Sequence, residues 1–315
     1  MLRAMTELRD ATAVTPCPVC EGARFATAFT AVGHRFERCR GCRFVRMADA
    51  PTPAELAAFY ESDRLSGESG WQEHEKNLVR FDGILAAIER HVRPGRLLDV
   101  GCSLGTSLVA ARKRGWTAVG LELSRPAAEF GRKEWDLDIR MQTLDEAGFA
   151  PGSFDAVLMH HTLEHVAAPD RVLAQVRDVL AVGGVTYQSL PNHDSAKARL
   201  FGRHFGWGIT PEHVSHFSRR TLTRLLRRIG FTVVDVSTWS YAQDPRFLFD
   251  LIHRLGLEGR FMRACGKPGQ PIDARTYLDF LHRRRWAHFV CNRLWPARLV
   301  RWLRLGEDLH LIARK

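Results

Sequence analysis

Apolar residues recur at helical spacing in the first third of the chain. The positions Leu78, Phe81, Leu85, Ile88 and Val92 stand three or four residues apart, a spacing that places them on one face of an α-helix. The segment from Asn77 to Val92 therefore predicts an amphipathic helix that packs on a core. A shorter helix is expected to begin at Pro53, and the polar stretch ESDRLSGESG (61–70), rich in Gly and Ser, predicts a link between the two.

A short apolar run then leads into an acidic residue and two glycines. Leu97 to Val100 predicts a buried parallel strand that contains Asp99, and Gly101 and Gly105 stand in the turn after it. A helix is expected over 106–114. Glycines let a backbone turn tightly and approach a ligand, and a helix N-terminus favours negative groups. The pattern indicates a nucleotide-type turn.

The next predicted strand, TAVGLELS, ends at Glu122. In doubly wound nucleotide folds an acidic residue about 20 positions after the glycine turn holds the ribose hydroxyls. The dehydrogenase fingerprint is G-x-G-x-x-G, whereas the spacing here is G-x-x-x-G. The sequence therefore predicts an α/β nucleotide-binding sheet and gives less support to a dehydrogenase.

Strand and helix patterns alternate again in the middle of the chain. Phe154 to Met159 predicts a buried strand, and Gly183 and Gly184 are expected to end the helix that follows. Ser218 is the expected N-cap of the last regular helix. The buried face of the first helix carries Val172, Leu173, Val176 and Leu180, and that of the second carries Leu222, Leu225, Leu226 and Ile229.

Four cysteines near the N-terminus form two close pairs. Cys17 with Cys20, and Cys39 with Cys42, each make a C-x2-C turn, and two such turns supply four thiolates to a tetrahedral Zn²⁺. The residues between the pairs have the Thr and aromatic content of short strands, so we expect a zinc ribbon with a closed, structural site. A redox pair and buried thiols are the alternatives.

The composition limits the classes of binding partner but does not select one of them. The 315 residues are 45% apolar and carry a formal net charge of +11, which suits nucleic acid, phosphate or an acidic membrane surface. The N-terminal segment has acidic residues and no signal-peptide core, and no run of about 18 uncharged apolar residues occurs. We expect a cytoplasmic protein without a membrane span.

The stretch DVGCSLG (99–105) resembles the first motif of class I S-adenosylmethionine (SAM) dependent methyltransferases, with Ser103 where that family usually has another glycine. The segment 153–192 is similar to the family's fourth strand, next helix and fifth strand. The family's order places a third strand near 138–142, strand six at 231–240 and an antiparallel strand seven at 307–315. The resemblance, over about half the chain, implies an α/β fold with a Rossmann-like, doubly wound seven-stranded sheet, a zinc ribbon and a helical insertion before the last strand.

This resemblance also implies domain limits and a SAM site. The expected parts are a zinc ribbon (1–50), a helical linker region (51–94), a SAM-binding core (95–240), a basic helical insertion (241–305) and a final core strand (306–315). The residues implied to contact SAM are Asp99, Gly101, Cys102, Gly105, Glu122, Leu123, Thr143, Leu144, His160 and His161.

Methyl transfer to a hydroxyl or an acidic carbon needs a base, and histidine suits that task near neutral pH. In HHTLEHV (160–166) the first two histidines follow a parallel strand, whose carboxyl end faces the ligand crevice. His161 is thus one candidate, while Glu164 and His165 either share in the chemistry or hold the loop.

A second cluster, PEHVSHF (211–217), resembles the substrate loop of zinc-ribbon-bearing sugar C-methyltransferases of natural-product pathways. That resemblance implies proton removal by Glu212 and His213, with His216 as an alternative base. The preceding segment 192–211 mixes aromatic, basic and Gly residues, and predicts either a mobile lid or an ordinary surface loop.

The expected function is SAM-dependent methylation of a carbon or oxygen of a small molecule such as a sugar, a lipid-linked glycan or a secondary metabolite. The Arg- and Trp-rich insertion either contacts an anionic membrane or a carrier-bound substrate, or packs on the protein or a second subunit. An RNA methyltransferase that binds phosphates through the ribbon is the main alternative. A SAM-binding protein without catalysis is the third reading.

Overall fold

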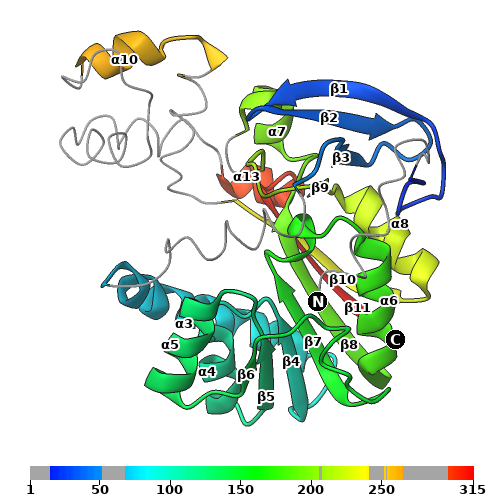
Figure 1. Cartoon of the computed structure of the whole chain (residues 1–315), viewed down its shortest axis with the longest axis vertical. Helices are drawn as coiled ribbons and strands as arrows, with labels where there is room; N and C mark the ends of the chain where they lie inside the picture. Colours follow the sequence, from blue (N-terminus) through cyan, green and yellow to red (C-terminus); the bar gives the residue numbers. More distant parts are fainter. Residues whose placement is uncertain (1–14, 52–67, 206–207, 241–251, 253, 265–296) are drawn as a thin grey trace.

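A computed structural model describes residues 15–51, 68–205, 208–240, 252, 254–264 and 297–315 (Figure 1). The strands form two sheets, one of seven strands and one of four. The expected short helix at Pro53, the spare thiols Cys265 and Cys291, and most of the basic insertion lie outside these residues.

The seven-stranded sheet has the order β10-β11-β8-β7-β4-β5-β6. Neighbours from β8 to β6 run parallel, and β11 lies antiparallel between β8 and β10. This arrangement confirms the predicted Rossmann-like, doubly wound sheet. Its strands are β4 (Arg96–Val100), β5 (Thr117–Leu121), β6 (Ile139–Arg140), β7 (Phe154–His160), β8 (Leu180–Pro191), β10 (Thr232–Trp239) and β11 (Asp308–Arg314).

Helices cover both faces of this sheet (Figure 1). One apolar core joins it to α3 (Glu68–Glu89), α4 (Thr106–Lys113) and α5 (Arg125–Trp135). A second core joins the other face to α6 (Pro169–Val179) and α8 (Arg219–Ile229). The helical spacing of apolar residues predicted the buried faces of α3 and α8. Ser218 caps α8 as expected, by accepting a hydrogen bond from the Thr221 amide.

Three N-terminal strands build most of the small sheet. They are β1 (Phe25–Ala31), β2 (His34–Cys39) and β3 (Val45–Met47), joined in antiparallel order, and the fourth strand is β9 (Ser215–His216) from much later in the chain. We call residues 17–47 the ribbon. In Figure 1 its blue strands lie beside β9, α7 (Ala196–Phe201) and α8, at one end of the large sheet.

Two element boundaries differ from those predicted. Helix α3 begins at Glu68, so the last three residues of the polar stretch 61–70 are helical. Helix α6 ends at Val179, and Gly183 and Gly184 lie within β8 instead of ending the helix. The pairing of β7 with β8 shifts in register there, and a Cβ on Gly184 would lie 2.9 Å from the Asp155 carbonyl oxygen. A close backbone approach, not a helix cap, requires glycine at that position.

The segment 192–211 contains regular structure where a mobile lid or surface loop was expected. Helix α7 and the 3-10 turn η2 (Gly202–His204) occupy part of it, and Phe201, Phe205 and Ile209 pack in one apolar cluster with the ribbon residue Phe36. The described remainder of the C-terminal insertion includes α10 (Glu258–Ala264) and α13 (Ala297–Trp302). Among the described helices, none is both long and apolar enough to cross a membrane.

Candidate functional site

The glycine turn after β4 has an unusual backbone. Gly101 and Gly105 have φ angles of 81° and 84°, in the left-handed region that glycine adopts without steric cost. Ser103 between them has φ 51°, so this turn accepts a side chain where the family usually has glycine. The Gly101 amide donates to the Leu121 carbonyl at 2.8 Å, which ties the turn to the end of β5.

Two acidic side chains flank this turn. Asp99 is buried and accepts a hydrogen bond from the Ser107 hydroxyl. Burial raises the pKa of Asp99 to about 7, although the Ser107 hydrogen bond opposes that rise. The Glu122 carboxylate accepts hydrogen bonds from the amides of Ser103 (2.8 Å) and Ser124 (2.7 Å), which fix it just beyond β5.

The loop after β7 lies directly against the turn. A Cβ on Gly101 would lie 2.6 Å from Thr162 Oγ1, and the Thr162 hydroxyl donates to the Val100 carbonyl at 2.9 Å. His160 ends β7 and His161 follows it with φ 53°. The glycine turn and this His pair therefore share the carboxyl edge of the sheet, where doubly wound folds bind ligands.

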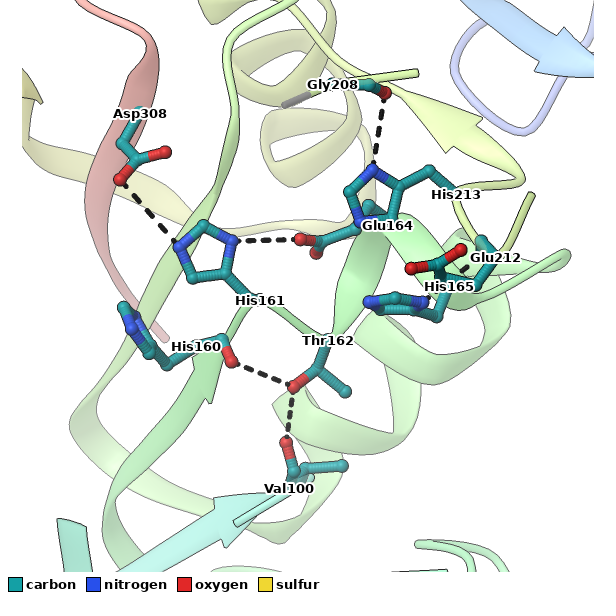
Figure 2. A network of polar contacts seen from close by, with 10 residues as sticks. All are labelled: Val100, His160, His161, Thr162, Glu164, His165, Gly208, Glu212, His213 and Asp308. Carbon is teal, nitrogen blue, oxygen red and sulfur yellow. Dashed lines mark hydrogen bonds and ion pairs between the residues drawn. The ribbon is translucent and has the colours of Figure 1, made fainter. Parts of the chain in front are cut away.

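Figure 2 shows the His161 ring between two carboxylates. Its Nδ1 lies 3.0 Å from Glu164 Oε1 and its Nε2 lies 3.8 Å from Asp308 Oδ2, and both carboxylates are buried. Burial lowers the pKa of His161, but Glu164 and Asp308 more than offset it and the net shift is upward. Burial raises the pKa of Glu164, and the His161 hydrogen bond reverses that shift to a net lowering. The contact between His161 and Glu164 therefore favours a charged imidazolium beside an ionised carboxylate.

His213 approaches the same Glu164 from the loop 208–217 (Figure 2). Its Nδ1 lies 3.3 Å from the Gly208 carbonyl oxygen, which can only accept, so Nδ1 carries a proton. Burial lowers the pKa of His213, although the Glu164 charge opposes this shift. Ligand atoms of Glu164, His165 and His213 lie within 4.8 Å of one another. The neutral ring thus keeps Nε2 as a proton acceptor next to an anionic group.

The expected pairing of Glu212 with His213 needs correction. The Gly208 carbonyl, and not the Glu212 carboxylate, is hydrogen-bonded to His213 Nδ1. The Glu212 backbone carbonyl instead accepts a hydrogen bond from His165 Nδ1 at 3.1 Å. Glu212 lies in a turn in which the His213 amide donates to the Thr210 carbonyl at 3.2 Å, and adjacency in sequence did not bring its carboxylate into a hydrogen bond with the His213 ring.

His216, the alternative base, lies at the ribbon. Its ring centroid is 5.1 Å from that of Phe36 and 5.4 Å from that of His193. Burial lowers the pKa of His216 well below its usual range. The ring has the environment of a packed aromatic residue more than that of a group at the edge of a crevice.

The remaining residues expected around SAM differ in exposure. Cys102 and Leu144 are buried, whereas Leu123 is 45% exposed. Thr143 donates hydrogen bonds from its amide and its hydroxyl to Glu146, both at 3.0 Å. His160 packs edge-on against Phe81, with ring centroids 5.1 Å apart.

Sequence reasoning missed two groups of this site. Asp308, the first residue of β11, reaches His161 only because the last strand inserts beside β8. Its signal was the acidic pair that opens the final strand pattern. The Gly208 carbonyl is a backbone atom, and no residue type in the sequence marked it as the partner of His213.

The four cysteines lie together at the base of the ribbon. The Sγ atoms of Cys17 and Cys42 are 3.5 Å apart, those of Cys20 and Cys39 are 3.6 Å apart, and all four lie within 4.8 Å of one another. Sulfurs around a tetrahedral Zn²⁺, at Zn–S distances of about 2.3 Å, stand about 3.8 Å apart. The four side chains are free thiols, and their spacing fits one shared metal ion.

Comparison with known proteins places this site in a family. A family model described as a methyltransferase domain matches residues 71–236. The chain is 29% identical over 181 residues to the ubiquinone biosynthesis O-methyltransferase of Xanthomonas campestris pv. campestris, an alignment that covers 53% of this chain and 74% of that protein. Its identity to the protein of the same name from Chromobacterium violaceum is 27% over 183 residues, covering 53% and 77%.

The fold is similar to that of one solved structure. A SAM-dependent methyltransferase from Archaeoglobus fulgidus aligns with a TM-score of 0.50 and 16% sequence identity, covering 82% of this chain and 99% of that chain. At this identity the likeness concerns the fold alone.

Proposed function

Because the chain belongs to the methyltransferase domain family and is a SAM-dependent methyltransferase, we propose that it methylates a hydroxyl oxygen or an acidic carbon of a small molecule, with His213 as the general base. SAM, when bound, supplies the methyl group from its sulfonium to the acceptor. The observation that carries the proposal is the contact between the glycine turn and the histidine loop. The Thr162 hydroxyl donates to the Val100 carbonyl, and its side chain fills the position that a Cβ on Gly101 would take. Thr162 precedes Glu164 by two residues.

The residues proposed to hold SAM are those that the resemblance implied. Gly101 and Gly105 give a turn that a ligand can approach closely. The two backbone amides that bind Glu122 fix its carboxylate, whose other lone pairs remain for ribose hydroxyls. Leu123 offers partly exposed apolar surface beside it. These features support a site for an adenosine-bearing ligand at the tips of β4 and β5.

Calorimetric titration with SAM and with S-adenosylhomocysteine tests this site. Glu122→Ala should weaken binding of both ligands by about tenfold or more, because a hydrogen-bonded carboxylate is lost. Glu129→Ala is the matched control, since Glu129 lies on the following helix with its side chain 59% exposed. Equal binding by the two variants would remove Glu122 from the site.

The geometry around His213 supports its role as base. The Gly208 carbonyl fixes the tautomer, so Nε2 can take the proton of an acceptor hydroxyl. The neutral ring is available near neutral pH because burial lowers its pKa. Once protonated, the ring lies near the anionic Glu164, whose charge stabilises the imidazolium. His161 stays engaged with Glu164 and Asp308, and we propose that it orients this carboxylate.

Release of S-adenosylhomocysteine from SAM, measured with a panel of phenolic, hydroxylated-sugar and nucleotide-sugar acceptors, tests the base. His213→Gln should lower kcat by about 10²–10⁴ while SAM binding is unchanged. Glu212→Gln, the matched neighbour, should lose less than about tenfold, because its carboxylate does not hold the ring. A His213→Gln enzyme with wild-type kcat would refute the assignment.

The acceptor class rests on different support. The named O-methyltransferase relatives support an oxygen acceptor on a small molecule, and the PEHVSHF resemblance keeps a sugar carbon as the finer alternative. RNA as the methyl acceptor stays a prediction from the positive net charge of the chain. The same assay tests it with ribosomal and transfer RNA. Methylation of RNA alone, weakened steeply by salt, would favour that alternative.

We further propose that Cys17, Cys20, Cys39 and Cys42 hold one structural Zn²⁺. Four thiolates close the coordination sphere, so the ion would stabilise the ribbon and take no part in methyl transfer. Metal analysis should give one zinc per chain, and Cys39→Ser should lower that ratio. Zinc-free, folded wild-type protein with disulfides would contradict this assignment.

A further inference from the structure

The ribbon and the loop that carries His213 share one sheet. Strand β9 pairs antiparallel with β3, with Val45 opposite His216 and Arg46 opposite Ser215. The Met47 amide adds a hydrogen bond of 2.9 Å to the Val214 carbonyl. The edge of the ribbon is therefore completed by a segment from the catalytic half of the chain. We call residues 208–217 the acceptor loop.

Side chains reinforce this backbone pairing. The rings of Phe36 and His216 meet edge-on at 5.1 Å, and those of Phe44 and Phe217 lie 5.1 Å apart. Val214 packs in the same apolar cluster as Phe36. The side chains of Val214 and of the four ring residues are all buried. The acceptor loop thus has one side embedded in the ribbon.

Its other side binds the methyltransferase core. The Val214 amide donates to the Glu164 carbonyl at 2.9 Å, and the Ser215 hydroxyl donates to the Val166 carbonyl at 2.8 Å. Only a two-residue strand stands between ribbon and core at this point. A shift of the ribbon would move His213, which precedes Val214, relative to Glu164.

The cysteines set the geometry of the ribbon edge. Cys39 ends β2, and Cys42 lies three residues before β3 begins. Within this turn the Cys39 amide donates to the Phe44 carbonyl at 2.8 Å. A metal bound to both thiols would hold β2 and β3 together at the point from which β3 reaches β9.

The glycine turn is held by other partners. The amides of Gly101 and Cys102 donate to the Leu121 carbonyl at 2.8 and 3.0 Å, and the Ser103 amide donates to Glu122. These bonds join β4 to β5 and involve no ribbon residue. Ribbon order and the order of the glycine turn are therefore separable.

From this separation we propose that the ribbon is the support of the acceptor loop, so that Cys17, Cys20, Cys39 and Cys42 act as positioning residues for His213. The inference rests on the proposed function for the role of His213. Its first measurement, hydrogen–deuterium exchange of the acceptor loop, does not depend on that function. Loss of the metal or of the β3–β9 pairing loosens the acceptor loop and lowers turnover. Binding of S-adenosylhomocysteine stays intact.

The decisive variant breaks the pairing and keeps the cysteines. Met47→Pro removes the amide that donates to Val214, since proline has no N–H. Met47→Leu is the matched control, because it retains the amide and a similar buried volume. Zinc content, hydrogen–deuterium exchange of 208–217 and of 97–105, calorimetric S-adenosylhomocysteine affinity and turnover are measured on both. Wild-type protein stripped by a chelator is measured alongside.

For Met47→Pro we expect zinc to stay bound and exchange in 208–217 to accelerate by about tenfold or more, while exchange in 97–105 is unchanged. Turnover falls and S-adenosylhomocysteine affinity stays within about threefold of that of Met47→Leu. Unchanged exchange in 208–217 overturns the proposal, and so does loss of S-adenosylhomocysteine binding by Met47→Pro together with faster exchange throughout. If removal of the metal by the chelator unfolds the whole chain, the comparison of Met47→Pro with Met47→Leu alone decides whether the ribbon supports the acceptor loop. Failure of every acceptor with wild-type protein counts against the proposed function, and the exchange comparison still tests the support.

Discussion

A buried ion pair joins the segment after β8 to the start of β11, and it offers a stability test. Lys197 on α7 lies 3.1 Å from Glu307, and each side chain is 1% exposed. The Asn192 side-chain amide donates to the Gly306 carbonyl, and the Ala196 amide to the Leu305 carbonyl, at 2.9 Å each. The ion pair therefore lies within a junction that holds α7 near Asp308.

Replacing one partner of such a pair leaves a charge without compensation in a dry environment. Lys197→Met should lower the free energy of unfolding by about 3–5 kcal/mol, because the buried Glu307 carboxylate loses its cation. At roughly 2–4 °C per kcal/mol for a chain of a few hundred residues, Tm falls by about 6–20 °C. The double variant Lys197→Met with Glu307→Gln should recover part of this loss, since its remaining amide is neutral.

Thermal and urea unfolding of the two single variants and the double variant form the assay. Coupling of about 2 kcal/mol or more between the two positions is expected. Arg199→Met is the matched control on α7, because its ion pair with Asp194 is 58% exposed on both sides and should contribute less than about 1 kcal/mol. If Lys197→Met costs no more than Arg199→Met, or if the single effects simply add, the reasoning from burial is wrong.

Three further predictions use local features. Ser218→Ala removes the cap of α8 and should cost about 1 kcal/mol in urea unfolding. An unchanged midpoint would show that the cap contributes nothing. Gly101→Val should abolish S-adenosylhomocysteine binding through its clash with Thr162, whereas Gly115→Val, at a similar φ with open space around it, should retain binding by calorimetry. The Asp99 carboxyl of the ligand-free protein should contribute stability at pH 5.5 that is lost as pH rises through 7, because burial raises its folded-state pKa to about 7 from a lower unfolded value. The free energy of unfolding of wild type minus that of Asp99→Asn should therefore fall by about 2 kcal/mol between pH 5.5 and 8, and a difference that does not change with pH would refute the assignment.

The predictions that succeeded depend on local periodicity. The apolar faces of α3 and α8 and the buried run of β4 are set by residues a few positions apart, so their patterns could be read directly. Boundaries were less secure because long-range contacts decide them. Gly and Ser content predicts a link where α3 begins. The glycine pair predicts a helix end at Gly184, whereas the close backbone of Asp155 is what requires glycine there.

The predictions named several members of the cluster around Glu164 but not the contacts between them. His161, Glu164 and His213 were all singled out, but their common meeting point depends on the sheet order and on a turn at Gly208. Asp308 lies far along the chain from His161, and only the insertion of β11 beside β8 brings the two together. Residue types indicate which groups can do chemistry, whereas topology decides which of them meet.

The pairing of β3 with β9 shows why the fourth strand of the small sheet was not predicted. A two-residue strand leaves no periodic pattern, and Ser215 and His216 are not strong strand formers. They become a strand because Glu164 and Val166 bind one side of the loop while the ribbon edge offers unpaired backbone groups to the other. The segment is thus ordered by its two neighbours more than by its own sequence. Because the ribbon is one of those neighbours, a change in its metal site would reach His213 without any contact between a cysteine and the acceptor.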